Sequence, residues 1–301
     1  MNYIGALDGF RAIAVSLVLL THLWQYPRGY EFFNRFAQLG WAGVDLFFVL
    51  SGFLITRILL ESKNRPFYFR NFYARRSLRI FPAYYVLLAL VLLAVPSISH
   101  SPGLESVRLD GWMYVLYLSN FAIAAGGFQL FLLDITWSLA VEEQFYLLWP
   151  AIVKFSHHLG PVCRWLVIGL PVVRSILWMY GVDWIWIHMM MPLRADSFAV
   201  GALVAMGLRI PFLTLALIPV ILTLAWGGNY DRSSMLVGTI GYSLNAFAGA
   251  AILSLALSEG RFARLLSTKP FRHVGKVSYG IYLFHPICLA ATVSFPVKRT
   301  V

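Results

Sequence analysis

Long apolar stretches separated by short polar segments make up most of this chain. A helix needs about 20 mostly apolar residues to cross a membrane, where unpaired backbone groups cannot be left in lipid. The pattern therefore predicts an all-α polytopic transmembrane bundle of about ten helices. The runs at 111–125 and 195–208 are short for a full crossing, so each is compatible with a re-entrant segment or with a crossing assisted by neighbouring helices. The expected spans are 6–24, 39–59, 78–96, 111–125, 136–154, 162–180, 195–208, 210–226, 236–258 and 275–295.

Composition agrees with this reading and limits the function. Hydrophobic residues account for 59% of the 301 positions and charged residues for 12%, about half the charged share of a soluble domain. The formal net charge is +11, but a basic excess in a membrane protein usually marks cytoplasmic loops, so no nucleic-acid partner is expected. No internal repeat or linker divides the chain, which we expect to form one membrane domain over residues 1–301.

Basic residues cluster between the second and third expected spans. The positive-inside rule makes this loop cytoplasmic and places the N-terminus on the same side. The loop 259–276 is also basic and would be cytoplasmic, yet a strict count of ten spans puts it outside. Either one short segment does not cross or the earlier loop dominates orientation. The earlier cluster comprises Arg57, Lys63, Arg65, Arg70, Arg75, Arg76 and Arg79, against the single acid Glu61.

Two ionisable residues lie on the first span. Arg11 and His22 are eleven residues apart, close to three helical turns, so they share one face with a rise of ~16 Å between them. Arg11 lies near the cytoplasmic entrance and His22 toward the far side, a separation comparable to the pantetheine arm of coenzyme A. Ionisable residues within a membrane are functional candidates, although snorkelling and simple polar packing are the alternatives.

Three arginines precede the third span at the membrane surface. Arg75, Arg76 and Arg79 are followed directly by the apolar run that begins at Ile80. Guanidinium groups suit phosphates because they donate bidentate hydrogen bonds in a fixed fork. An orientation signal combined with contacts to anionic lipid is the alternative interpretation.

Two adjacent carboxylates interrupt the apolar run TWSLAVEEQFYLLWP. Adjacent helical residues point ~100° apart, so Glu142 and Glu143 cannot share a face. Glu142 continues a polar stripe from Ser138, whereas Glu143 shares its face with leucines, so we expect Glu142 to face the interior. A membrane-embedded carboxylate must be paired, neutral or in a wet cavity, and each of these states supports proton transfer or the orientation of an imidazole.

Other polar positions within the apolar runs are interpreted as helix-packing or supporting residues. No His, Cys and carboxylate cluster has the spacing of a metal site, so no metal is expected. The positions are Asp45, Ser51, Arg194, Asp196, Tyr279 and His285.

Taken together, these motifs resemble the bacterial acyltransferase-3 family of membrane acyltransferases. The resemblance runs in order along nearly the whole chain, and the combination is far more specific than any one element. It rests on LDGFRAIAV, GVDLFFVLSGFLI, RRSLRIFPAYY, WSLAVEEQFYLLWP, RADSFAVGAL and VSYGIYLFHP.

The resemblance implies an enzyme of the bacterial cytoplasmic membrane. It would take acyl groups, usually acetyl, from cytoplasmic acyl-CoA as co-substrate and deliver them to a carbohydrate or glycolipid acceptor such as O-antigen, exopolysaccharide or peptidoglycan. The essential arginine and histidine of the family map onto Arg11 and His22, its paired arginines onto Arg76 and Arg79, and its WSL-segment glutamate onto Glu142. The chain stops at Val301, just past the last expected span. We therefore expect no fused esterase-like domain, so the chain completes transfer alone or hands the acyl group to a separate transferase.

These residues suggest a mechanism and leave one rival. Acyl-CoA would dock on Arg76 and Arg79, and His22 would act as general base or accept the acyl group itself. Glu142 is expected to orient or charge-balance the imidazole. The rival is a secondary transporter, because intramembrane Arg, Glu and His also build ion pathways.

Overall fold

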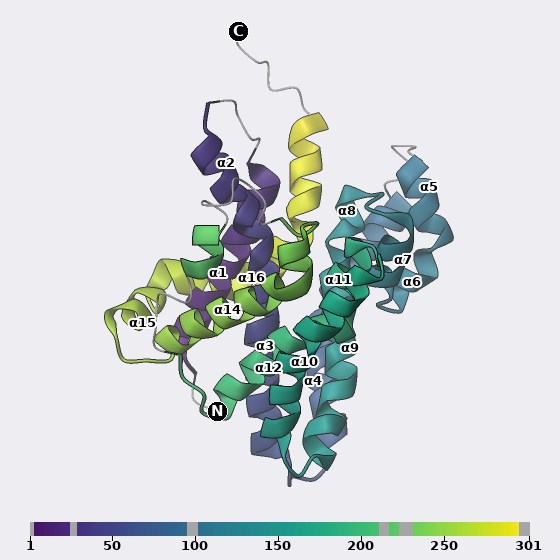
Figure 1. The fold of residues 1–301 in the computed structure, drawn as a ribbon. Coiled ribbons are helices and arrows are strands. Elements are labelled where there is room, and N and C mark those ends of the chain that lie inside the picture. The colour runs from purple at the N-terminus through teal and green to yellow at the C-terminus, as the bar shows by residue number, and fades with distance from the viewer. Residues whose placement is uncertain (1–2, 25–28, 95–101, 211–216, 223–230, 295–301) are drawn as a thin grey trace.

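The computed structural model is helical throughout the part of the chain that it describes, residues 3–24, 29–94, 102–210, 217–222 and 231–294 (Figure 1). The prediction of an all-α bundle is confirmed. The helices and helical turns are α1 (Gly5–Leu23), α2 (Glu31–Gln38), η1 (Leu39–Ala42), α3 (Gly43–Ser62), α4 (Tyr68–Ala89), η2 (Leu90–Ala94), α5 (Pro102–Leu109), α6 (Gly111–Val115), α7 (Ser119–Gly126), α8 (Phe131–Asp134), α9 (Thr136–Phe155), α10 (Leu159–Met179), α11 (Trp184–Met189), α12 (Met191–Ala205), η4 (Val237–Gly241), α14 (Tyr242–Ala256), α15 (Arg261–Leu266) and α16 (Lys269–Ser294).

Among the described residues, five helical segments are long and apolar enough to cross a membrane. The remaining long helices, α9, α12 and α16, carry more polar residues and pack alongside them. The expected span 210–226 falls mostly outside the described residues. The five segments are Gly5–Leu23, Phe32–Ser62, Tyr68–Leu93, Leu159–Met179 and Val237–Ala256.

The predicted basic loop between the second and third spans is mostly helical, so that prediction was wrong. α3 continues to Ser62 and α4 already begins at Tyr68. Arg75, Arg76 and Arg79 therefore lie on α4 rather than in a loop. Hydropathy locates only the apolar part of a helix, whereas arginine is a good helix former and lets α4 continue beyond the apolar run.

The segment between α4 and α9 does not cross the bundle. α9 is antiparallel to α4, because Tyr68 donates a hydrogen bond to the Pro150 carbonyl while Arg76 contacts Tyr146. The end of α4 and the start of α9 therefore lie at the same end of the molecule. The expected span 111–125 is instead broken into the short helices α6 and α7, which turn back at residues 116–118.

Side chains of α4 and α9 bind the carbonyl groups of this turn. Tyr84 and Tyr85 donate hydrogen bonds to the carbonyls of residues 114 and 115, at 2.8 and 3.0 Å. Gln144 donates to the Tyr117 carbonyl at 3.0 Å. Irregular backbone within a membrane requires such internal partners. We call α6, α7 and the turn between them the re-entrant hairpin, since this segment is broken rather than one long crossing helix.

A count of ten spans put the basic segment 259–276 on the side opposite the earlier basic cluster. Because this hairpin is not a crossing helix, the two basic segments lie on the same side. α3 starts beside the second half of α1 and runs antiparallel to it, since Gly40, just before α3, packs against Leu17 and Gly43 packs against Ala14. α16 instead runs parallel to α1, with Gly275 packed against the Asp8 backbone. The end of α3, the start of α4 and the segment 259–276 consequently lie at one end of the molecule, with the start of α1. We call this the basic end.

Close helix contacts and buried ion pairs hold the centre together. Gly52 packs against the backbone of Phe198, and Gly201 against that of Val49, so α3 and α12 approach closely. Arg194 pairs with Asp45 between the same two helices, and both side chains are almost fully buried. A second buried pair joins Arg174 of α10 to Asp196 of α12 at 2.9 Å. These ion pairs belong to the scaffold.

Candidate functional site

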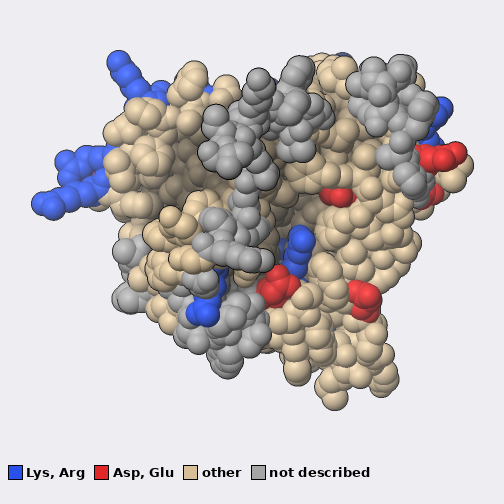
Figure 2. Space-filling model, turned by 90° about the horizontal axis from the view of Figure 1, so that it is seen from above, with Lys and Arg blue, Asp and Glu red and all other residues tan. Residues whose placement is uncertain are grey.

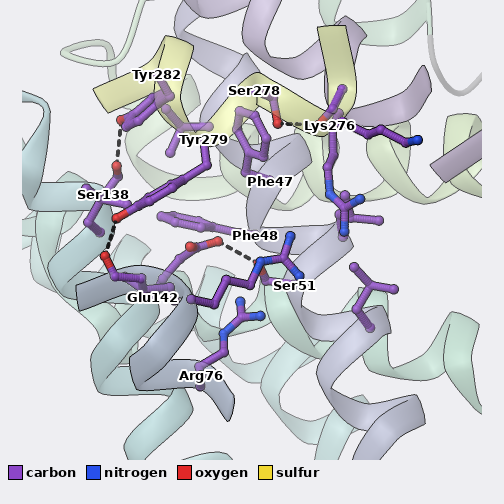
Figure 3. Close-up of a pocket in the computed structure, with 18 residues that line it drawn as sticks. Phe47, Phe48, Ser51, Arg76, Ser138, Glu142, Lys276, Ser278, Tyr279 and Tyr282 are labelled. Carbon is purple, nitrogen blue, oxygen red and sulfur yellow. Dashed lines mark hydrogen bonds between the residues drawn. The ribbon is translucent and has the colours of Figure 1, made fainter. Parts of the chain in front are cut away.

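A narrow central cavity lies where α1, α3, α4, α9 and α16 meet (Figure 3). Its volume is about 110 Å³. Cationic side chains outnumber acidic ones around it, since Glu142 is the one carboxylate among the described lining residues. Such an excess of guanidinium groups favours an anionic ligand. The cationic lining residues are Arg11, Arg76, Arg79 and Lys276.

Glu142 is held in this cavity by hydroxyl groups and by Arg76. Ser51 of α3 donates a hydrogen bond to the Glu142 carboxylate at 2.6 Å. The Ser51 and Tyr146 hydroxyls are 3.0 Å apart. Arg76 donates to the Tyr146 hydroxyl, and its guanidinium lies 4.1 Å from the centre of that ring. The side chain of Arg76 is therefore already engaged within the protein.

Glu143 faces a different space. It lines a lateral cavity of about 270 Å³ between α4, α9 and the turn of the re-entrant hairpin. The side chains of Tyr117 and Gln144 line the same cavity. The two adjacent glutamates thus face separate cavities on either side of Arg76, which lines both.

A larger basic cavity adjoins the central cavity at the basic end. Its volume is about 470 Å³, and it shares Arg76 and Arg79 with the central cavity. Arg65 and Arg75 also line it, with Glu61 as the acid among its described lining residues. Arg75 and Arg79 are exposed, unlike Arg76. Their guanidinium groups are free to meet a ligand that enters from this end.

His22 lies in another cavity, toward the opposite end of the molecule. This histidine cavity has a volume of about 330 Å³ and is bounded largely by aromatic side chains, among them Trp41, Phe131 and Trp137. Asp134 and Arg232 also line it. Figure 2 looks onto this end of the molecule and shows a mainly uncharged surface that is hollowed near its middle.

The hydrogen bond of His22 determines which ring nitrogen is free. Its Nδ1 lies 2.9 Å from the Val18 carbonyl. Because a carbonyl oxygen only accepts, Nδ1 carries the hydrogen, and in the neutral ring Nε2 keeps its lone pair. The ring packs beside those of His285 and Phe131, at centroid distances of 4.9 and 5.8 Å. Nε2 is thus the nitrogen able to take a proton or attack a carbonyl carbon.

The central and histidine cavities meet at Val44 and Tyr282, which line both. The Tyr282 hydroxyl lies 2.6 Å from that of Ser138, which fixes the ring between the two spaces. Arg11 lines one cavity and His22 the other, so the shared helix face leads to two different compartments. Arg11 also donates a hydrogen bond to Asp8 at 2.6 Å.

The structure does not bring Glu142 to His22, so the expected role of Glu142 in orienting the imidazole is not supported by the geometry. Glu142 instead contacts Ser51 and lies in the central cavity. Neither Tyr146 nor Tyr282 was singled out from the sequence. Tyr146 follows Glu142 by one helical turn and shares its face, a signal that was available. Tyr282 gives no such local signal, because its position depends on the packing of α16 against α3 and α9.

Comparisons with known proteins identify the relatives of this chain. The family model of an acyltransferase domain matches residues 4–295. Peptidoglycan O-acetyltransferase OatA of Listeria monocytogenes is 31% identical over 97% of this chain and 50% of its own length. The putative peptidoglycan O-acetyltransferase YrhL of Bacillus subtilis is also 31% identical, over 97% of this chain and 49% of its own length.

O-acetyltransferase OatA of Staphylococcus aureus is 28% identical over 94% of this chain and 50% of its own length. The chain therefore spans about half the length of the curated relatives that it matches. No solved structure matches it.

Proposed function

This chain belongs to the acyltransferase family, and we propose that it transfers an acetyl group from acetyl-CoA to a hydroxyl of a cell-surface glycan. The observation that carries the proposal is the meeting of two unlike cavities at Tyr282. An arginine-lined cavity leads from the basic end, and a cavity with a free histidine nitrogen leads from the other. A donor and an acceptor could then meet without sharing an entrance.

The donor enters from the basic end. Coenzyme A carries phosphates at one end and a thioester at the other, joined by a long neutral arm. Exposed Arg75 and Arg79 bind the phosphates in the basic cavity, where bidentate guanidinium contacts are strong. The arm then passes through the narrow central cavity toward Tyr282. The positive-inside rule makes the basic end cytoplasmic, which is the side where acetyl-CoA is available.

The acceptor enters the histidine cavity from the opposite end. His22 Nε2 takes the proton of the acceptor hydroxyl while the oxygen attacks the thioester carbonyl. The new carbon–oxygen bond replaces the carbon–sulfur bond, and the sulfur leaves as the thiolate of coenzyme A. The aromatic walls, including Trp41 and Trp137, suit the faces of sugar rings.

Arg11 and Glu142 act on the donor side of Tyr282. Arg11, held by Asp8, provides a positive charge along the path of the arm. Glu142 accepts the hydrogen bond of Ser51, whose hydroxyl adjoins that of Tyr146, the residue that binds Arg76. These roles keep both residues in the machinery of transfer without contact to His22.

Peptidoglycan is the acceptor to test first, because two relatives are named as peptidoglycan O-acetyltransferases. O-antigen and exopolysaccharide have the same kind of hydroxyl. The chain either completes the transfer itself or delivers the acetyl group to a separate extracytoplasmic transferase. It would act in the bacterial cytoplasmic membrane.

The test uses the full chain in nanodiscs, with acetyl-CoA labelled in the acetyl group and peptidoglycan fragments as acceptor. Two quantities are measured, the release of coenzyme A thiol and the label in the glycan. We expect thiol release in every case and glycan label where the chain completes transfer alone. Absence of thiol release, together with uptake of intact acetyl-CoA into vesicles, would instead support the secondary transporter.

A further inference from the structure

His285 lies beside His22, although the two residues are far apart in the sequence. α1 and α16 run parallel and in close contact, and the two imidazole rings have centroids 4.9 Å apart with a tilt of 47°. His285 is 6% exposed. Its Nδ1 lies 2.7 Å from the Tyr282 carbonyl. Nδ1 therefore carries the hydrogen, as in His22, and Nε2 has the lone pair of the neutral ring.

The Nε2 atom of His285 is buried and has no hydrogen-bond partner within the described part of the chain. A buried polar atom without a partner destabilises the folded state, so such atoms call for an explanation. The neighbouring ring offers one. When His22 takes up a proton, that proton must reside on Nε2, because Nδ1 is already bound to Val18. Protonated His22 then carries an N–H donor at Nε2. The neighbouring ring of His285 has an acceptor, its own Nε2, to which no group donates.

We propose that His285 is a positioning residue that accepts a hydrogen bond from protonated His22 and shares its proton during transfer. This inference rests on the proposed function. The acceptor hydroxyl loses its proton to His22 Nε2 as the carbon–oxygen bond forms. His285 Nε2 accepts the resulting N–H of His22, which stabilises the imidazolium. The proton then passes to the thiolate as the carbon–sulfur bond breaks, so that coenzyme A leaves as the thiol.

Asp134 and His188 are the other groups that could share this proton, because they line the same cavity. One oxygen of Asp134 already accepts the backbone N–H of Leu130 at 3.2 Å. The His188 ring packs against Trp137, and its Nδ1 lies 2.9 Å from the Tyr242 hydroxyl, whereas the His285 ring lies beside that of His22. Arg232 also lines the cavity, but guanidinium only donates and cannot accept the proton. His285 is therefore the better placed acceptor, and Asp134 supplies a matched control.

The first measurement needs no variant. The rate of coenzyme A release by the wild type, with labelled acetyl-CoA and peptidoglycan fragments or water as acceptor, is followed in mixtures of H₂O and D₂O. The proposed step moves one proton, so a rate limited by that transfer falls in a straight line as the deuterium content rises. We expect this fall in the wild type, and a rate that does not depend on deuterium content would overturn proton transfer as the step in which His285 acts.

The second measurement uses His285→Gln and His285→Ala. We expect the maximal rate to fall about a hundredfold, the lower end of what positioned proton transfer contributes, with the KM for acetyl-CoA unchanged. In His285→Gln the fall of the rate with deuterium content should be at least as steep as in the wild type, because the slower proton transfer then limits the rate more fully. In His285→Ala, added imidazole should restore rate, whereas pyrazole, of the same shape but hardly basic, should not.

Two controls separate proton sharing from packing. Leu283→Ala removes a fully buried side chain from the same helix, and imidazole should not rescue any activity that it loses. Asp134→Asn should keep most of the maximal rate and gain nothing from added imidazole. A larger loss of maximal rate in Asp134→Asn than in His285→Gln, or equal rescue of His285→Ala by pyrazole, would overturn the proposal. A wild type that releases no coenzyme A would contradict the proposed function itself, which is a different result.

Discussion

The central cavity and the histidine cavity differ in almost every property except their shared wall. The central cavity is narrow and surrounded by cationic side chains, and it continues into the basic cavity. The histidine cavity is larger, bounded by aromatic rings, and lined by His22 and His188, with His285 beside His22. A charged donor needs the first environment, whereas proton transfer from a neutral hydroxyl needs the second. The proposed function therefore places donor recognition and proton transfer on opposite sides of Tyr282.

The sharpest way to break this division is to remove the base. His22→Ala should lower the maximal rate of coenzyme A release by about a thousandfold, within the range that general base catalysis contributes. The KM for acetyl-CoA should stay the same, because the arginines of the donor side are untouched. Steady-state kinetics in nanodiscs measure both quantities.

His22→Gln is the control for this change, since it keeps a polar side chain of similar length but cannot take the proton. It should be as slow as His22→Ala and equally well inserted in the membrane. A rise in KM without a loss of maximal rate would place His22 on the donor side instead.

Glu142 and Glu143 test whether the central cavity matters more than the lateral cavity. Glu142→Gln leaves the neighbouring arginines without their carboxylate. Ser51 and, through Tyr146, Arg76 then lose the group that positions them beside the donor path, so we expect turnover to fall roughly a hundredfold, about 3 kcal/mol in the barrier. Glu143→Gln should cost less than tenfold, because Glu143 lines the other side of Arg76. Equal losses in the two variants would show that the lateral cavity takes part in transfer.

Arg79 and Arg76 are expected to have different roles on the donor side. Arg79 binds the phosphates of the donor, whereas Arg76 supports the cavity through its contact with Tyr146. Arg79→Lys keeps the charge but loses the fork, and a charge-assisted contact contributes about 1.5–3 kcal/mol. We expect the KM for acetyl-CoA to rise about tenfold or somewhat more, with the maximal rate retained. Arg76→Lys should instead lower the maximal rate, because it breaks the contact with Tyr146. The same change in KM in both variants would assign phosphate binding to both.

Much of the fold followed from local sequence patterns. The run around Glu142 predicted a helix at 136–154, and α9 spans Thr136–Phe155. The start of α4 did not follow, because hydropathy does not report the polar first turns of a long helix. The re-entrant hairpin was one of two open alternatives. Its turn depends on hydrogen bonds from Tyr84, Tyr85 and Gln144, whose positions are set by tertiary packing.

The candidate site was partly predictable, because spacing along one helix indicates which residues share a face. The three-turn spacing of Arg11 and His22 gave both their common face and their different depths. The sequence did not predict the wall that separates the cavity of Arg11 from that of His22, since Val44 and Tyr282, which line both cavities, come from helices far apart in the sequence. The neighbourhood of His22 and His285 likewise requires α16 to pack along α1, with Gly275 against the Asp8 backbone. Spacing along one helix does not encode which other helix lies beside it.

Tyr282 offers the smallest expected effect and tests the shared wall itself. Tyr282→Phe keeps the ring that separates the two cavities and removes the hydroxyl beside Ser138. A neutral hydrogen bond contributes about 0.5–1.5 kcal/mol, so the maximal rate should change by at most about tenfold.

Tyr282→Ala, by contrast, removes the ring and joins the cavities. We expect this variant to let water reach the thioester, so that the ratio of acetyl-CoA hydrolysis to glycan acetylation rises, while Tyr282→Phe keeps the wild-type ratio. The ratio is obtained from thiol release and glycan label in the same reaction. An unchanged ratio in Tyr282→Ala would mean that the ring does not divide donor from acceptor, and that water is excluded elsewhere along the path.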